Sequence, residues 1–315
     1  MGRNNFGWKS RDMSKAGQFA LNDAARNGHC AYASAATHGE RFGQFADFAK
    51  ASGARWLEDV TPDLVRDFGR GLADQVRAGE VSPAYAQNLV SSINTTMKLV
   101  TRGGWESVSP VKDCGIEKRS KVRADAPAGL DRESFGRAMD SLRESGMNRQ
   151  ASIAELARDF GLRSEEASLF NAKRGLEEAR AHGRITVSDG TKGGRTREVP
   201  ITGDHQFGTL ERAAEIQGDH YSLVPADQTW KEFREGDLRD GREAIKESLG
   251  GHGYHDLRAA YACERYEDLT GREAPVVSGE GVDDRDADRA ARETIGEELG
   301  HGRSDVVSEY VGGRR

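Results

Sequence analysis

The first 115 residues contain several short amphipathic stretches, and two of these open with the same pair of residue types. A hydroxyl residue is followed by proline at Thr61-Pro62 and again at Ser82-Pro83. Ser or Thr at the N-cap and Pro at the first helical position are typical of helix starts, and apolar side chains follow at three- and four-residue spacing. An earlier stretch places Phe42, Phe45 and Ala49 on one face. The pattern predicts several helices that pack through their apolar faces.

The segment 116–129 interrupts this pattern. It is basic, contains Pro and Gly, and shows no apolar periodicity, which is typical of a solvated interdomain linker. A chain of 315 residues also exceeds the roughly 250 at which single cores usually stop growing. We therefore expect two domains, at 1–115 and 130–315, joined by the linker 116–129.

The second domain is predicted to be mostly helical with one exception. The run Ile185-Thr186-Val187, a polar turn with two glycines, and Val199-Pro200-Ile201 together indicate a β-hairpin. Helical patterns resume at 207–217, 228–248, 255–269 and 286–299, and Ser304 is a candidate N-cap for a last short helix. The predicted fold class is mainly α with a small β-hairpin in the C-terminal domain (α+β).

Composition limits the cellular setting. No apolar run approaches the ~20 residues of a membrane span, and the N-terminus lacks the apolar segment of a secretory signal. Three distant cysteines form neither a disulfide framework nor a zinc spacing. The residues thus predict a cytoplasmic protein with no membrane partner.

The net charge of −6 is unevenly distributed. Residues 1–124 hold 18 Lys and Arg against 13 Asp and Glu, whereas the stretch 271–299 holds nine acids and only four bases. Phosphate affinity depends on local basic surfaces. The total charge therefore does not exclude DNA as a partner.

Several polar residues of the second domain could serve chemistry. Arg163 and Glu166 share a helix face at i,i+3, although "IAELARDFGLRSEEAS" also matches a helix-turn-helix. His255 and Arg258 are spaced in the same way, and Lys192 lies at the hairpin tip. His252 and His255 form an H-x-x-H without a carboxylate or cysteine ligand nearby, so we predict no metal. Taken singly, each of these features is typical of ordinary structure.

In chain order the residues read Arg, Glu, Lys, His-x-x-Arg, His, Tyr. This order, together with "GLRSEEASL", "TKGGRTREVPI", "HDLRAAYA" and "ELGHGRSDVVSEYV", resembles the tyrosine recombinase (phage integrase) family. The resemblance covers 130–315, and 1–115 is similar more loosely to the family's helical DNA core-binding domain. It implies these catalytic residues: Arg163, Lys192, His255, Arg258, His301 and the nucleophile Tyr310, with Glu166 in support.

The resemblance also implies a reaction. Two arginines suit a phosphodiester that gains negative charge in its transition state. Tyr310 would form a 3′-phosphotyrosyl bond, His255 would be the candidate acceptor of its proton, and Lys192 would protonate the departing 5′-hydroxyl. Because the covalent bond stores the phosphodiester energy, no cofactor is expected.

The implied partners are double-stranded DNA attachment sites, three further copies of the chain in a tetramer on DNA, and an accessory directionality factor. The linker would contribute DNA contacts through Lys118, Arg119, Lys121 and Arg123. The origin implied is a bacterium, phage or mobile element. Two alternatives stay open: a non-catalytic helix-turn-helix regulator and a type IB topoisomerase. The gap between His255 and His301 is longer than is usual in the family, and its extra length is the acidic stretch "TGREAPVVSGEGVDDRDADRA". Only five residues follow Tyr310.

Overall fold

The computed structural model describes residues 3–314, and the chain separates into two compact units with bounds Met1–Ser120 and Lys121–Arg315. The division lies inside the segment 116–129, which has no helix or strand. That the first unit is a DNA core-binding domain stays a prediction.

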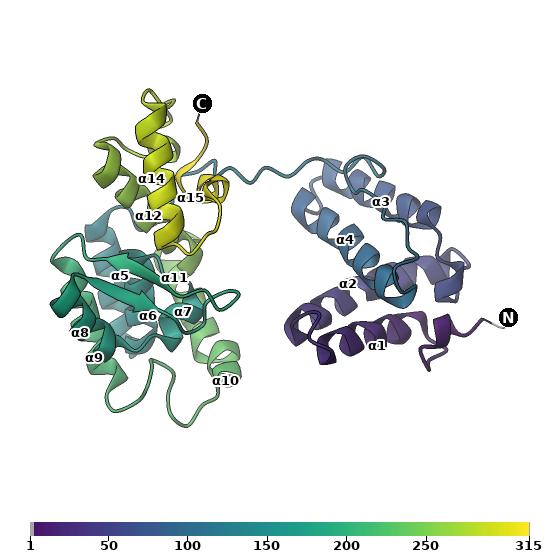
Figure 1. Ribbon diagram of the computed structural model, residues 1–315, viewed down its shortest axis with the longest axis horizontal. Coiled ribbons are helices and arrows are strands. Elements are labelled where there is room, and N and C mark those ends of the chain that lie inside the picture. The colour runs from purple at the N-terminus through teal and green to yellow at the C-terminus, as the bar shows by residue number, and fades with distance from the viewer. Residues whose placement is uncertain (1–2, 315) are drawn as a thin grey trace. The chain divides into compact units, whose positions relative to one another are not determined.

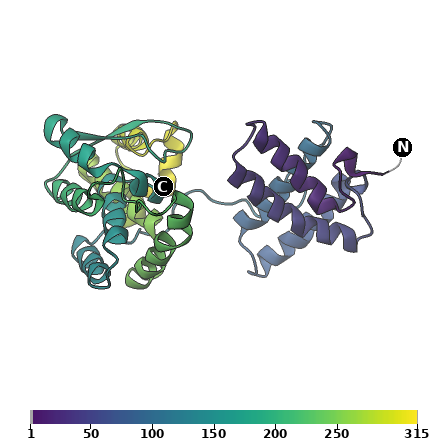
Figure 2. The same cartoon turned by 90° about the horizontal axis from the view of Figure 1, so that it is seen from below.

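All regular elements described between residues 3 and 120 of the first unit are helices. Within it α1 lies beside α2 and α4, and α3 packs against α4 (Figures 1 and 2). Its elements are the 3-10 turn η1 (Asn5–Gly7), α1 (Met13–Arg26), α2 (Tyr32–Ala51), the 3-10 turn η2 (Leu57–Asp59), α3 (Pro62–Arg77) and α4 (Pro83–Val100).

The two proline-marked helix starts are confirmed. The Thr61 side chain accepts a hydrogen bond from the backbone N–H of Leu64, and Ser82 accepts one from Tyr85, each at 3.2 Å. These bonds satisfy N–H groups that the first turn of a helix leaves free. The apolar face of α2 is confirmed as well, since Phe42, Phe45 and Ala49 are fully buried.

The second unit contains all of the remaining elements of the described chain. They are α5 (Arg132–Glu144), α6 (Asn148–Phe160), α7 (Ser164–Leu169), α8 (Ala172–His182), β1 (Arg184–Val187), β2 (Arg197–Pro200), α9 (His205–Gln217), α10 (Trp230–Glu235), α11 (Asp237–Ser248), α12 (Tyr254–Thr270), α13 (Pro275–Ser278), α14 (Arg285–Glu298), the 3-10 turn η3 (Ser304–Val307) and α15 (Ser308–Val311).

Two buried helices, α6 and α12, form the centre of this unit and pack against each other. Every residue of α6 from Ala151 to Phe160 is buried. The helix-turn-helix interpretation of this stretch is therefore wrong, because its first helix is core and the second, α7, is only six residues long. The last helices, α14 and α15, lie on α12 (yellow end of the chain in Figure 1).

The predicted hairpin is confirmed. Strands β1 and β2 pair antiparallel, with Ile185 opposite Val199 and Val187 opposite Arg197. Because side chains alternate between the two faces of a strand, Arg197 and Val199 point to the same side, and both are buried. The hairpin thus sends an arginine into the interior.

Two helix predictions need correction. The helix expected over 228–248 is broken at Gly236, whose φ and ψ of −106° lie outside the helical region. Ser304 is the first residue of η3 and caps nothing with its side chain; a four-residue α15 follows. None of the helices described over 3–314 offers enough continuous apolar length to cross a lipid bilayer.

Candidate active site

A buried carboxylate organises one side of the site. Glu166, in the first turn of α7, is fully buried. Its oxygens accept hydrogen bonds from the backbone N–H of Arg163 at 2.8 Å and from Nη1 of the same residue at 2.6 Å. Burial alone would raise the pKa of Glu166, but the hydrogen bonds and charge of Arg197, with the Arg163 N–H, lower it to about 2. Glu166 is therefore a permanent anion that fixes the start of α7.

Arg197 is the second cation on this carboxylate, and sequence reasoning missed it. Its Nη1 and Nη2 donate to the two Glu166 oxygens at 3.0 and 2.6 Å, and its Nε donates to the backbone oxygen of Glu298 at 2.8 Å. The available signal was the alternation of β2, which places Arg197 on the same face as the apolar Val199. A buried arginine requires a carboxylate partner.

The Arg258 side chain extends from α12 and is 1% exposed. Its Nη1 donates to the carbonyl of Gly161, and its Nη2 donates to the carbonyl of Leu299 at 2.6 Å. Burial lowers the pKa of Arg258 to about 10, so the guanidinium stays charged at neutral pH. Arg258 thus joins the loop before α7 to the loop after α14 through backbone carbonyls.

The hydroxyl of Tyr310 lies between a cation and an imidazole. Nε of Arg258 donates to it at 3.3 Å, and Nε2 of His301 lies 3.0 Å from it. Nη2 of Arg258 is also 3.3 Å from the same His301 nitrogen. The Tyr310 side chain comes from α15 and is 3% exposed. The hydroxyl therefore faces one guanidinium and one imidazole.

The protonation state of His301 follows from its neighbours. Burial and the charges of Arg258, Arg163 and Arg197 lower its pKa to about 4, so it is neutral at pH 7. Because a guanidinium can only donate, Nε2 is the acceptor and the ring proton lies on Nδ1, an assignment inferred from the network. The Tyr310 hydroxyl can then donate to His301 while it accepts from Arg258.

Glycines on both sides of His301 allow the hairpin to approach it. Gly300 has a φ of +70°, and a Cβ there would lie 3.1 Å from Cδ of Arg197. A Cβ at Gly302 would lie 2.6 Å from Nη1 of Arg195. Side chains at either position would displace the hairpin arginines.

His255 contacts Tyr310 in a different way. It lies in the first turn of α12 with part of its ring exposed, and its ring centroid is 5.5 Å from that of Tyr310 at a tilt of 50°. Partial burial and the charge of Arg258 lower its pKa. Within residues 3–314 no hydrogen bond joins it to the Tyr310 hydroxyl. The phenol contacts His255 through its ring and His301 through its oxygen.

Comparisons with known proteins show which family model and which folds the chain resembles. Residues 119–264 match the family model described as Integrase. The fold matches a lambda integrase dimer bound to a COC′ core site with a TM-score of 0.59 and 17% identity, covering 93% of this chain and 92% of that one. The chain thus matches an integrase family model over residues 119–264 and has the fold of solved tyrosine recombinases.

Two further solved recombinase structures share the fold. One is the XerH site-specific recombinase bound to its difH substrate, with a TM-score of 0.58, 17% identity and coverage of 95% of this chain and 82% of that one. The other is the Tn1549 transposon integrase in complex with transposon right end DNA, with a TM-score of 0.58, 11% identity and coverage of 94% and 95%. No curated protein matches the chain in sequence.

Other residues predicted for the site lie outside the cluster. Lys192 is exposed at the hairpin tip between Gly190 and Gly193, and over 3–314 no hydrogen bond or ion pair joins it to the arginines or histidines. In the linker, Lys118, Arg119 and Lys121 are exposed. Lys192 is therefore displayed at the surface of the unit.

Arg123 differs from the other linker cations. Its Nη2 pairs with Asp256, its Nε donates to the carbonyl of Asp125 at 2.7 Å, and its side chain is 15% exposed. A DNA contact at Arg123 stays a prediction, and its charge is already paired with Asp256 within the second unit.

The state of His301 gives a measurable pH dependence. Its folded pKa of about 4 is below the ordinary 6.5, so between these values only the unfolded chain takes up the proton. Stability should therefore fall as pH drops from about 6.5 to about 4, by at most about 3 kcal/mol from this group. We expect the free energy of unfolding to fall less steeply over this range in His301→Gln. The other histidines are present in the unmodified protein and in the variant, so their contributions cancel in the comparison. If the free energy of unfolding depended on pH equally in both, His301 would not be neutral as assigned.

Proposed function

We propose that the chain is a site-specific DNA recombinase that cleaves and rejoins strands through a 3′-phosphotyrosyl intermediate. One observation supports this most directly: the Tyr310 hydroxyl is hydrogen-bonded between the guanidinium of Arg258 and the neutral imidazole of His301. A phenol placed beside both a cation and a proton acceptor is suited to act as a nucleophile.

In the proposed cleavage step the Tyr310 oxygen attacks the scissile phosphorus, and the bond from phosphorus to the 5′-oxygen breaks. The phenol proton passes to Nε2 of His301, 3.0 Å away. This distance favours His301 over His255, the acceptor predicted from the sequence. Lys192, at the hairpin tip, gives a proton to the departing 5′-oxygen.

Positive charge around the phosphate would stabilise the transition state. Arg258 and Arg163 are the guanidinium groups we assign to the non-bridging oxygens, where planar forks bind strongly. Arg163 suits this role because its side chain is 27% exposed while its orientation is fixed by Glu166. Arg197 is buried and binds Glu166 and the backbone of Glu298, so we assign it a supporting role. Once protonated, His301 becomes a further donor.

Rejoining reverses these steps with a 5′-hydroxyl from another strand. Because the phosphotyrosyl bond conserves the phosphodiester energy, the reaction needs neither ATP nor a metal ion. A related fold, lambda integrase, has been solved as a tetramer bound to a Holliday junction, with a TM-score of 0.57 and 16% identity. We propose the same kind of assembly here, on double-stranded attachment sites, with an accessory directionality factor.

DNA affinity in this proposal comes partly from the linker and the basic first unit. Lys118, Arg119 and Lys121 are the exposed linker cations. The first unit, 1–120, holds 16 Lys and Arg against 13 Asp and Glu, a net charge of +3. Such contacts act on phosphates and set affinity more than sequence preference.

Covalent capture tests the proposal. The protein would be incubated with a pool of nicked duplexes that are randomised on both sides of the nick, so that a cleaved 5′ fragment diffuses away. After denaturation and digestion with trypsin, we expect nucleotides attached to the peptide 304–314 through Tyr310, and a common sequence among the captured DNAs. Specific binding without any covalent product would favour a non-catalytic regulator. Attachment at another residue would refute the assigned nucleophile.

A further inference from the structure

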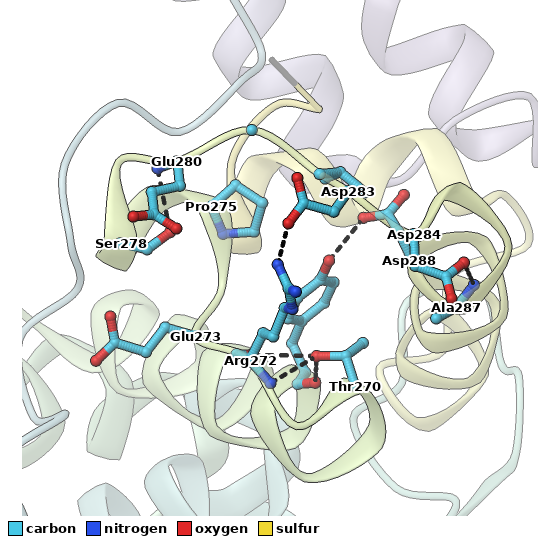
Figure 3. A pocket seen from close by; sticks show the side chains of 13 residues that line it. Thr270, Arg272, Glu273, Pro275, Ser278, Glu280, Asp283, Asp284, Ala287 and Asp288 are labelled. Atoms are coloured by element: carbon cyan, nitrogen blue, oxygen red, sulfur yellow. Dashed lines mark hydrogen bonds and ion pairs between the residues drawn. The ribbon is translucent and has the colours of Figure 1, made fainter.

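The acidic stretch 270–290 runs from the end of α12 into the beginning of α14 and lines a pocket of about 560 Å³ (Figure 3). Most of its acids face solvent, and Asp283 pairs with Arg272 across the opening. Asp288 differs, because its side chain is fully buried at the pocket wall. One acid of this stretch is thus part of the interior.

Asp288 accepts three hydrogen bonds. The Tyr266 hydroxyl donates to Oδ1 at 3.0 Å, Nε of Arg292 donates to the same oxygen at 2.7 Å, and Nε of Arg314 donates to Oδ2 at 2.7 Å. Burial alone would raise its pKa, but the hydrogen bond and charge of Arg292 hold the pKa of Asp288 below its ordinary value. Asp288 is therefore ionised at neutral pH.

Arg292 connects this carboxylate to the last residues of the chain. It is 1% exposed, and its Nη1 donates to the Ser308 hydroxyl at 3.1 Å and to the Gly312 carbonyl at 3.0 Å. These two acceptors lie two residues before and two residues after Tyr310. One guanidinium therefore holds both ends of the segment 308–312.

The rest of this segment is held by its backbone. The N–H of Arg123 donates to the Ser308 carbonyl at 2.9 Å, and Sγ of Cys263 lies 3.6 Å from the Tyr310 carbonyl. Gly312 has a φ of +86°, and a Cβ there would lie 2.9 Å from the backbone nitrogen of Val276 in α13. Since these contacts use backbone atoms, they leave the phenol free to face Arg258 and His301.

Stability alone does not account for this arrangement. Replacing a buried ion pair by apolar side chains is often neutral or stabilising, so such a pair is weak support for a purely structural role. Here the guanidinium donates to two acceptors on the 308–312 segment in addition to its carboxylate. The specific result is the placement of one short segment against α14.

We propose that Asp288 and Arg292 are positioning residues for Tyr310, which hold the segment 308–312 against the chain's own second unit. The proposal rests on the function proposed for Tyr310. It goes beyond that function by giving a role to the acidic stretch that contains Asp288. A displacement of about 1 Å at a reacting group can cost on the order of 100-fold in rate. Arg292 and Asp288 act through the segment and do not touch the phosphate.

Arg292→Lys tests the proposal, because lysine keeps a charge beside Asp288 but cannot reach both ends of the segment. Arg158→Lys is the matched control. Arg158 is also 1% exposed and bonds a carboxylate, Glu264, and a backbone carbonyl, that of Gly129. With a saturating concentration of a duplex recovered in the capture experiment, we expect Arg292→Lys to form covalent product about 10- to 100-fold more slowly than Arg158→Lys. The two variants should have similar DNA affinities and unfolding temperatures.

A second readout needs no DNA. In protein labelled with 3-fluorotyrosine, the ¹⁹F resonance that is absent from Tyr310→Phe belongs to Tyr310. We expect this resonance to shift or broaden in Arg292→Lys and to stay unchanged in Arg158→Lys. If the unmodified protein captures no DNA, the proposed function fails. The ¹⁹F spectrum still tests whether Arg292 positions Tyr310.

Ser308→Ala resolves the case in which Arg292→Lys does not fold. It removes one acceptor and leaves the Asp288–Arg292 pair intact, and we expect a loss of capture rate of about 3- to 10-fold. An unchanged Tyr310 resonance and capture rate in Ser308→Ala and in a folded Arg292→Lys would overturn the proposal. Equal losses of rate in Arg292→Lys and Arg158→Lys would also overturn it, since they would indicate a general loss of stability.

Discussion

Phenylalanine in place of Tyr310 is expected to abolish covalent capture of DNA while the protein still folds and binds DNA. The substitution removes one oxygen, which is hydrogen-bonded to Arg258 and His301, and leaves the buried ring in place. Loss of these bonds costs about 1 to 3 kcal/mol of folding stability, far less than is needed to unfold a typical domain. The measurement is the yield of denaturant-resistant protein–DNA product on the captured duplex.

Tyr261→Phe is the matched control for this experiment. Tyr261 is also 3% exposed and also loses a buried hydrogen bond, the one that its hydroxyl donates to Glu298 at 2.7 Å. We expect this variant to keep its covalent yield. Product that persists in Tyr310→Phe would show that another residue is the nucleophile. Loss of product in both variants would point to damage to the fold.

Arg258→Lys should lower the rate of cleavage by about 10²- to 10³-fold, while DNA affinity changes by only a few-fold. The guanidinium reaches the Tyr310 hydroxyl and two backbone carbonyls together, and a single ammonium cannot reproduce that geometry. Removal of one preorganised donor from a developing oxyanion costs about 3 to 4 kcal/mol. Single-turnover cleavage rates and equilibrium binding, measured on the same duplex, separate the two effects.

Lysine is preferred to alanine at this position for a structural reason. Alanine would leave the carbonyls of Gly161 and Leu299 without their donor, and a buried unpaired group costs about 1 to 3 kcal/mol. Arg158→Lys again controls for general destabilisation. Equal reductions of binding and cleavage in Arg258→Lys would contradict a role in the transition state.

The features that the sequence predicted well are local ones. Thr61-Pro62 and Ser82-Pro83 mark helix starts because each cap bonds an N–H three residues away. The spacing of Arg163 and Glu166 likewise brings the N-cap residue of α7 beside a residue of its first turn, and the two form an ion pair at 2.6 Å. In such cases the partners are close in sequence, so a short pattern contains the whole interaction.

Contacts between distant residues could not be obtained in this way. Arg197 pairs with Glu166 across 31 residues of chain, and the carbonyls of Gly161 and Leu299 meet only at Arg258. The role of the acidic stretch between His255 and His301 could not be predicted for the same reason. Its net charge says nothing about Asp288, whose role depends on Arg292 and on a segment 20 residues further along.

The proton acceptor shows a different limit. His255 and His301 are both consistent with the sequence, since each lies in a stretch that resembles the family. Only the fold shows that the Tyr310 oxygen faces His301 while its ring faces His255. The order of residues along the chain does not contain that orientation.

The hydrogen bond from Arg123 to the Ser308 carbonyl places the beginning of the second unit beside its end. Residue 123 lies within the linker 116–129, just after the unit boundary at Ser120, and Ser308 precedes Tyr310 by two positions. Tension in the backbone at 121–123 is therefore transmitted through one hydrogen bond to the segment 308–312. Under the proposed reaction, the length of the linker therefore affects the rate of cleavage. It also sets how far the first unit can extend from the second.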